Sequence, residues 1–277
     1  MAFDSTTFIY KCQESLFDVF DLVLEHRKLR VSLSNFLIAV HYIQMISLIF
    51  NASNPDLDTT IIKNFLFLGD YLLVFLGLSK TPSFMISLFI TVLISVVILS
   101  LLLGFLYIHV FKDPDDIFQK DLSNLLAFFY DALDHVFLIP CFGVLILNMT
   151  CSSYDCGSGI HIALIFWSIL LIVIIIFLEF LYVFCFFNFT FKIVDGFSRN
   201  PSQRPFLSFL IKILLITFTV VVDIRANYTI LVIAHSLYGW FLFQETLTHY
   251  PYHDKNVSKC YGIFVSAYFW INCCLFF

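Results

Sequence analysis

Charged residues are scarce in this sequence, and their scarcity excludes an ordinary soluble domain. Asp, Glu, Lys and Arg make up 13% of the 277 residues, whereas 60% are hydrophobic. Soluble domains average about 25% charged and about 45–50% apolar residues. The basic residues form no clustered patch of the kind that binds nucleic acid, so no nucleic-acid partner is expected. The composition instead predicts a protein whose main partner is the lipid bilayer.

The signatures of a catalytic or metal site are also missing. The eight cysteines form no CxxC pair and no His–Cys spacing typical of zinc. No phosphate loop, nucleophile elbow or HExxH sequence is present. We therefore expect no metal, no cofactor and no enzymatic activity. Glycine-rich linkers, internal repeats and a separate soluble domain are likewise not recognisable.

Long apolar stretches dominate what is present, and the clearest runs from 161 to 187. Apart from His161 at its start, Glu179 is the one acidic or basic residue in this stretch. As a helix it would be roughly 40 Å long, against roughly 30 Å for the hydrocarbon core of a bilayer. A helix also satisfies its own backbone hydrogen bonds in hydrocarbon. The stretch is therefore predicted to be a transmembrane helix.

The whole chain divides into a short N-terminal segment and a membrane domain. Residues 1–30 place acidic residues on one helical face and apolar residues on the other, which predicts an amphipathic helix. Residues 31–277 form the predicted transmembrane domain, and we expect it to be truncated because the last apolar block ends at Phe277. Eight apolar blocks are recognisable, at 31–51, 62–79, 82–111, 123–149, 160–188, 206–222, 228–247 and 260–277.

The distribution of Lys and Arg decides how many of these blocks cross. With a cytoplasmic N-terminus and eight crossings, six basic residues lie in the cytoplasm and eight outside. If block 62–79, which carries Asp70 at its centre, stays on the outer side, every later loop changes sides. The cytoplasm then holds eleven basic residues and the outer side holds three. Cytoplasmic loops of membrane proteins are enriched in Lys and Arg. We therefore predict an all-α transmembrane helical bundle of about seven spans, with 62–79 re-entrant or interfacial.

Two ionisable residues inside predicted spans are candidates for function, because charges in hydrocarbon cost a few kcal/mol. Lys212 lies early in block 206–222, and Glu179 lies two-thirds of the way through its own span. A Glu179–Lys212 pair between neighbouring helices would relieve both penalties. The commoner alternatives are that Lys212 extends to the cytoplasmic interface and that Glu179 reaches the headgroups. His41 stands isolated in its block.

A second group of polar residues begins block 123–149. Asp131, Asp134 and His135 form a candidate polar cluster that could relay protons, although an interfacial position is the commoner explanation. Pro140 leaves the carbonyl of Val136 without its helical hydrogen-bond donor, so it is a candidate helix kink. Such a bend either forms a cavity or simply serves the packing of the helices.

Cys151 and Cys156 lie in a predicted outer loop, where a disulfide can form. The pairing would stabilise this loop, but both cysteines remaining free is equally compatible with the sequence.

Several stretches resemble the membrane region of the tiny macrocysts protein family, which comprises large polytopic proteins of protists. They are HYIQMISLIF at 41–50, VFLIPCFGVLILNMTC at 136–151, SRNPSQRPFLSFLIKILL at 198–215 and LTHYPYHDKNVSKCYGIFVSAYFW at 247–270. The resemblance implies the membrane-anchor or sensor portion of a larger signalling protein. Its expected partners are other membrane subunits or a downstream soluble domain. The alternative function is a channel or transporter for an ion or small solute.

Overall fold

A computed structural model describes residues 31–53, 84–111, 117–149, 158–181, 204–221, 224–248, 252 and 254–276. These residues form an all-α structure, as predicted. The helices are α2 (Val31–Ser53), α4 (Phe84–Val110), α5 (Ile117–Ala132), α6 (Leu138–Leu147), α7 (Gly159–Leu181), α8 (Arg204–Val221), α9 (Ile224–Thr248) and α10 (Lys255–Phe276). A π-helical segment, η1 (Leu133–Phe137), joins α5 to α6. The predicted amphipathic helix 1–30, block 62–79 and Cys151 and Cys156 lie outside the described residues.

Four stretches of the described chain are long and apolar enough to cross a membrane. They are Val31–Ile49, Leu88–Val110, Phe118–Leu147 and Gly159–Leu181. Leu207–Thr219 in α8 is also apolar but shorter. The chain therefore has the character of a membrane protein. The expected total of about seven spans stays a prediction.

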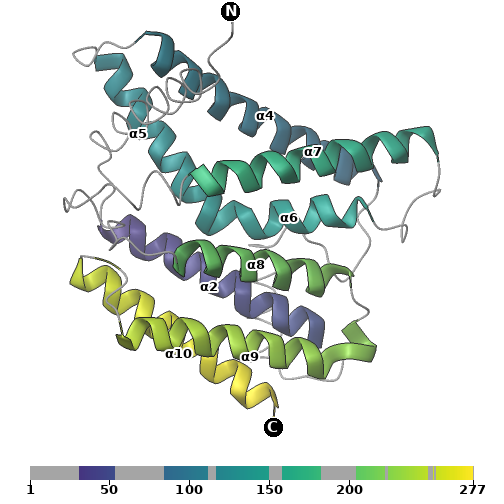
Figure 1. The fold of residues 1–277 in the computed structure, drawn as a ribbon, viewed down its shortest axis with the longest axis vertical. Helices are drawn as coiled ribbons and strands as arrows, with labels where there is room; N and C mark the ends of the chain where they lie inside the picture. The colour runs from purple at the N-terminus through teal and green to yellow at the C-terminus, as the bar shows by residue number, and fades with distance from the viewer. Residues whose placement is uncertain are drawn as a thin grey trace, which may run out of the picture.

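The helices pack side by side in a layered bundle (Figure 1). α4 and α7 lie along one side, and α6 packs against both of them. α8 packs against the opposite face of α6 and against α2. α9 and α10 close the other side of the bundle, where both contact α2. The α5–η1–α6 segment, hereafter the α5–α6 helix, therefore lies between the α4–α7 side and the rest of the molecule.

Successive helices run in alternating directions between two ends of the bundle (Figure 1). Gln119 Nε2 donates a hydrogen bond to the carbonyl of Phe111, which ties the start of α5 to the end of α4. At the opposite end, Asn148 Nδ2 donates to Thr91 Oγ1 at 2.9 Å and connects the end of the α5–α6 helix to the beginning of α4. The end of α2 and the start of α4 lie at this same end. The described helices thus return the chain to alternate ends, as a multi-pass threading requires.

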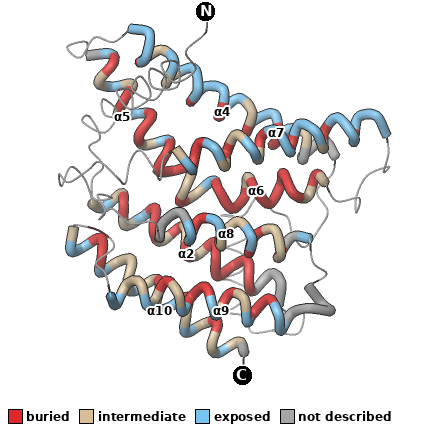
Figure 2. Tube along the Cα trace, viewed as in Figure 1, coloured by how far each residue is buried: buried red, intermediate tan, exposed pale blue. Residues whose placement is uncertain are grey.

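Burial distinguishes the outer faces of α4 and α7 from those of a soluble bundle. In α7 the buried positions recur at helical spacing and include the polar residues His161, Ser168 and Glu179. The outward positions are large and apolar, such as Phe166, which is 70% exposed. α4 shows the same outer face, and much of its length is coloured as exposed in Figure 2. An apolar surface with polar groups inside is suited to lipid rather than water as the solvent.

Candidate functional site

Lys212 forms a buried ion pair in the interior of the bundle. Its Nζ atom lies 2.8 Å from Oδ1 of Asp134, and the Lys212 side chain donates to that carboxylate. Lys212 lies midway along α8 and is 6% exposed. The interpretation in which Lys212 extends to the interface is therefore wrong. Asp134 belongs to η1, so the pair joins α8 to the α5–α6 helix.

Asp131, Asp134 and His135 lie at the middle of the apolar stretch Phe118–Leu147. Asp131 is fully buried and His135 is 6% exposed. Asp131 and His135 are therefore inside the bundle, and their expected position at the membrane interface stays a prediction. His135 Nδ1 lies 3.0 Å from the backbone carbonyl of Asp131 and 3.4 Å from Oδ2 of Asp134. The three residues form one compact polar group together with Lys212.

The helix that carries these residues is interrupted in its backbone pattern. η1 adopts π-helical hydrogen bonding immediately before α6, and Pro140 in the first turn of α6 has no N–H to donate to Val136. Gln44 of α2 supplies the missing donor, with Nε2 at 2.9 Å from the Val136 carbonyl. π-helical segments within helices often occur at functional sites. The α5–α6 helix changes direction in this region (Figure 1).

Two further residues from other helices belong to this site. His41 of α2 stacks edge-on to His135 with ring centroids 6.0 Å apart and lies within electrostatic reach of Asp134 and Lys212. Glu179 of α7 is 1% exposed and lies within electrostatic reach of the same charges. Within the described residues, Oε1 of Glu179 and Nδ1 of His41 have no hydrogen-bond partner. His41 is therefore not isolated, contrary to the expectation from its block.

We refer to these residues as the charged cluster: His41, Asp131, Asp134, His135, Glu179 and Lys212. The structure brings together two groups that the sequence suggested separately. Glu179 and Lys212 share one cluster, but the carboxylate in contact with the Lys212 ammonium belongs to Asp134. The sequence alone assigned neither Gln44 nor His41 to a site. Their signal was a pair of polar residues three positions apart, which lie on one face of α2.

The chemistry available to the charged cluster is the binding and movement of protons or charge. It contains three carboxyl groups, two imidazoles and one ammonium group. Among the described residues, no group of three or more His, Cys, Asp or Glu side chains has the arrangement of a metal site. In hydrocarbon an ionised carboxylate without a counter-charge is costly. A carboxyl group that has no cation to pair with therefore favours the protonated state.

Two other polar networks hold the bundle together away from the charged cluster. Asn148 at the end of α6 donates to Thr91 and Ser168, at 2.9 and 3.0 Å. On the other side of the molecule, His235 Nδ1 of α9 lies 2.6 Å from the hydroxyl of Tyr268 in α10. Such interhelical hydrogen bonds are the usual role of polar residues within membrane bundles.

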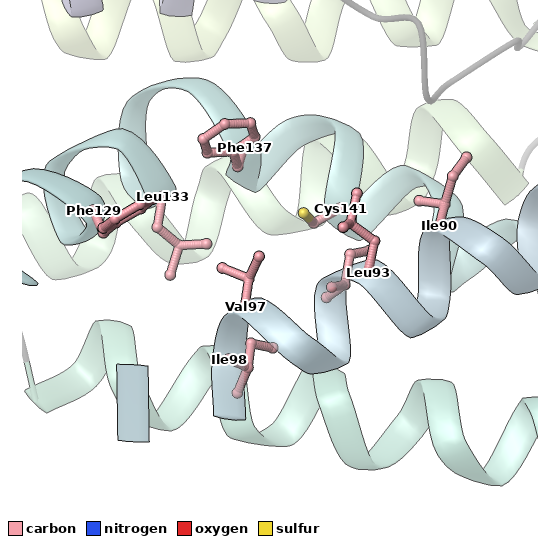
Figure 3. Close-up of a pocket in the computed structure, with 9 residues that line it drawn as sticks. Ile90, Leu93, Val97, Ile98, Phe129, Leu133, Phe137 and Cys141 are labelled. Carbon is pink, nitrogen blue, oxygen red and sulfur yellow. The ribbon is translucent and has the colours of Figure 1, made fainter. Parts of the chain in front are cut away.

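An apolar pocket lies between α4 and the α5–α6 helix. It has a volume of about 120 Å³ and is lined by Ile90, Leu93, Ile94, Val97, Ile98, Phe129, Leu133, Phe137 and Cys141. Figure 3 shows side chains from both helices directed toward this space. Its lining has no charged residue, so it is chemically distinct from the charged cluster.

Comparison with known proteins adds no identification: no family model matches the chain, and no curated protein or solved structure is significantly similar to it.

Proposed function

We propose that this chain is a multi-pass integral membrane protein with seven crossings and a cytoplasmic N-terminus. Four stretches are apolar and long enough to cross, and α8, α9 and α10 run alongside them in alternating directions. In this threading the N-terminal side carries eleven basic residues and the other side carries three. Lys212 is left inside the bundle, where Asp134 neutralises its charge.

As function, we propose the membrane-anchor and sensor portion of a larger signalling protein. The observation that carries this proposal is the buried ion pair between Asp134 and Lys212. Removing the charge of one partner leaves the other uncompensated in a medium of low dielectric constant, which is strongly destabilising. A pair of this kind therefore has two discrete states, made and broken. Breaking it would release α8 from the α5–α6 helix and convert a change of charge into a movement of helices. The resemblance to the tiny macrocysts membrane region supports the same function.

A distance measurement between the two helices tests the sensor proposal. Spin labels at Phe118 and Leu207, which are both exposed, would report the separation of α5 and α8 in lipid nanodiscs. We expect Asp134→Asn to add a second distance population. The matched variant Glu245→Gln, on α9, should leave the distribution unchanged. A distribution that is identical in the Asp134→Asn variant and the parent protein would contradict the sensor mechanism.

A channel or transporter is the second candidate, and the interruption of the α5–α6 helix favours it. Transporters place binding sites near the bilayer midplane at discontinuous helices. Asp134 and His135 lie in such an interruption at the middle of a candidate span. Reconstitution into liposomes with an internal pH-sensitive dye tests this candidate. Proton or cation flux that Lys212→Met abolishes would establish transport, and the absence of flux in the parent protein would exclude these ions as substrates.

A further inference from the structure

Glu179 is a member of the charged cluster that forms no ion pair with Lys212 in the structure. Its side chain is buried on α7, and Oε1 has no hydrogen-bond partner within the described residues. Among the described residues, the ammonium group within electrostatic reach is that of Lys212, and it already lies 2.8 Å from Asp134. An ionised Glu179 would therefore be an unpaired buried carboxylate, whereas a protonated Glu179 would be neutral.

The groups that face Glu179 come from several helices. Asp131 and Asp134 of the α5–α6 helix repel a negative charge there, and Lys212 of α8 attracts one. His41 and His135 lie around the Asp134–Lys212 pair. The hydroxyl of Tyr130 donates to the carbonyl of Leu178, the residue before Glu179. On the neighbouring α4, the titratable side chains are Tyr107 and His109 in its last two turns.

We propose that Glu179 is a proton-binding site and that Lys212 is shared between two carboxyl groups. In the first arrangement, Lys212 forms the ion pair with Asp134 that the structure contains, and Glu179 carries the proton. In the second arrangement, Lys212 pairs with an ionised Glu179 and the proton resides on Asp134. This inference rests on the proposed function, because it makes the charged cluster the responsive site and names the proton as its ligand.

The exchange is balanced in atoms and charge. The O–H bond of Glu179 breaks, an O–H bond forms on a carboxylate oxygen of Asp134, and the Lys212 ammonium moves to the new carboxylate. The three groups together have zero net charge before and after the exchange. Neither arrangement therefore leaves an uncompensated charge among these three groups in the low-dielectric interior. The pair Glu179–Lys212, one of the candidates that the sequence offered, is the second of the two arrangements.

Infrared spectroscopy of protonated carboxyl groups tests this inference directly. The protein would be prepared in nanodiscs at neutral pH, with and without ¹³C-glutamate, so that a band from a protonated glutamic acid shifts on labelling. The chain has four glutamates, at positions 14, 25, 179 and 245. We expect a labelled band in the parent protein and in the control Glu245→Gln, and its loss in Glu179→Gln. Labelling identifies the residue type in the unmodified protein, so the test survives if a variant does not fold.

A second variant tests the exchange of partners. Asp134→Asn frees Lys212 to pair with Glu179, so we expect the band from protonated glutamic acid to disappear. The absence of the band from the parent protein, or its survival in Glu179→Gln, would overturn the proton-binding site. Its survival in Asp134→Asn would overturn the exchange. The band does not depend on flux or helix movement, so a failure of the proposed function and a failure of this inference are distinguishable.

Discussion

Gln44 of α2 donates a hydrogen bond to the carbonyl of Val136, with Nε2 and the oxygen 2.9 Å apart. Pro140 cannot donate to this carbonyl because it has no N–H. The bond therefore repairs, from another helix, a defect in the backbone of the α5–α6 helix. It also fixes α2 against the segment that presents Asp134 and His135.

Gln44→Leu should destabilise the protein by about 1–2 kcal/mol, because it leaves the Val136 carbonyl buried without its donor. Thermal or denaturant unfolding in detergent measures the loss. Gln244→Leu, at an exposed position on α9, is the matched control and should change stability by less than about 0.5 kcal/mol. Equal stability of the two variants would show that the bond does not contribute.

The same bond should be coupled to Pro140. Pro140→Ala restores a backbone N–H that can donate to Val136, so Gln44→Leu should cost less in that background. A double-mutant cycle measures the difference, which we expect to be about 0.5–1 kcal/mol. Strictly additive effects would mean that the proline and the glutamine act independently.

Replacing one partner of the buried Asp134–Lys212 pair by an apolar residue should destabilise the protein. Lys212→Leu leaves Asp134 as an uncompensated buried charge and should destabilise the protein by about 3–5 kcal/mol. Asp134→Leu should cost less, because Glu179 can take over the pairing with Lys212. The double substitution removes both charges, and it should be much closer to the parent protein than Lys212→Leu. Expression level and unfolding temperature of the three variants check this expectation. A double variant as unstable as the sum of the single ones would contradict it.

Close packing of α9 and α10 should depend on Gly239. A Cβ atom at this position would lie 3.2 Å from Cα of Phe269, and a backbone atom cannot easily move away. Gly239→Val should therefore destabilise the protein by about 1–3 kcal/mol. Gly159→Val is the control, since a Cβ there meets nothing within 4 Å. An equal effect at the two positions would argue against close contact of these helices.

The hydrogen bond between His235 and Tyr268 should also stabilise the α9–α10 side. Tyr268→Phe removes the hydroxyl that lies 2.6 Å from Nδ1 of His235 and should cost about 1–2 kcal/mol. Tyr107→Phe, at a half-buried position of α4, provides the comparison. Unfolding of both variants in the same detergent measures the effect. A Tyr268→Phe protein as stable as Tyr107→Phe would show that the bond is dispensable.

The helices were largely predictable from the sequence, because unbroken apolar runs have few other solutions in a membrane. Block 82–111 corresponds to α4 (Phe84–Val110), and block 206–222 corresponds to α8 (Arg204–Val221). The start of α5 was harder to predict from the sequence. Ile117–Leu122 contains Gln119, Lys120 and Asp121, so its hydropathy gave no reason to begin a helix there.

The partners within the charged cluster were not predictable, because hydropathy does not report which helices are neighbours. A buried Lys212 required a counter-charge, and the candidate that the sequence suggested was Glu179. The packing of α6 against α8 selected Asp134, which is 78 positions away from Lys212. Gln44 could not be assigned a role before α2 was known to lie beside Val136.

Labelling of single cysteines from the two sides of the membrane tests the central claim most directly. In a cysteine-free background, Phe111→Cys and Lys255→Cys lie at one end of the bundle, and Ser158→Cys and Val221→Cys lie at the other; all four positions are exposed. The account predicts that an impermeant thiol reagent labels the first two from the cytoplasmic side alone and the last two from the opposite side alone. Labelling of positions 111 and 158 from the same side of a sealed membrane would contradict it.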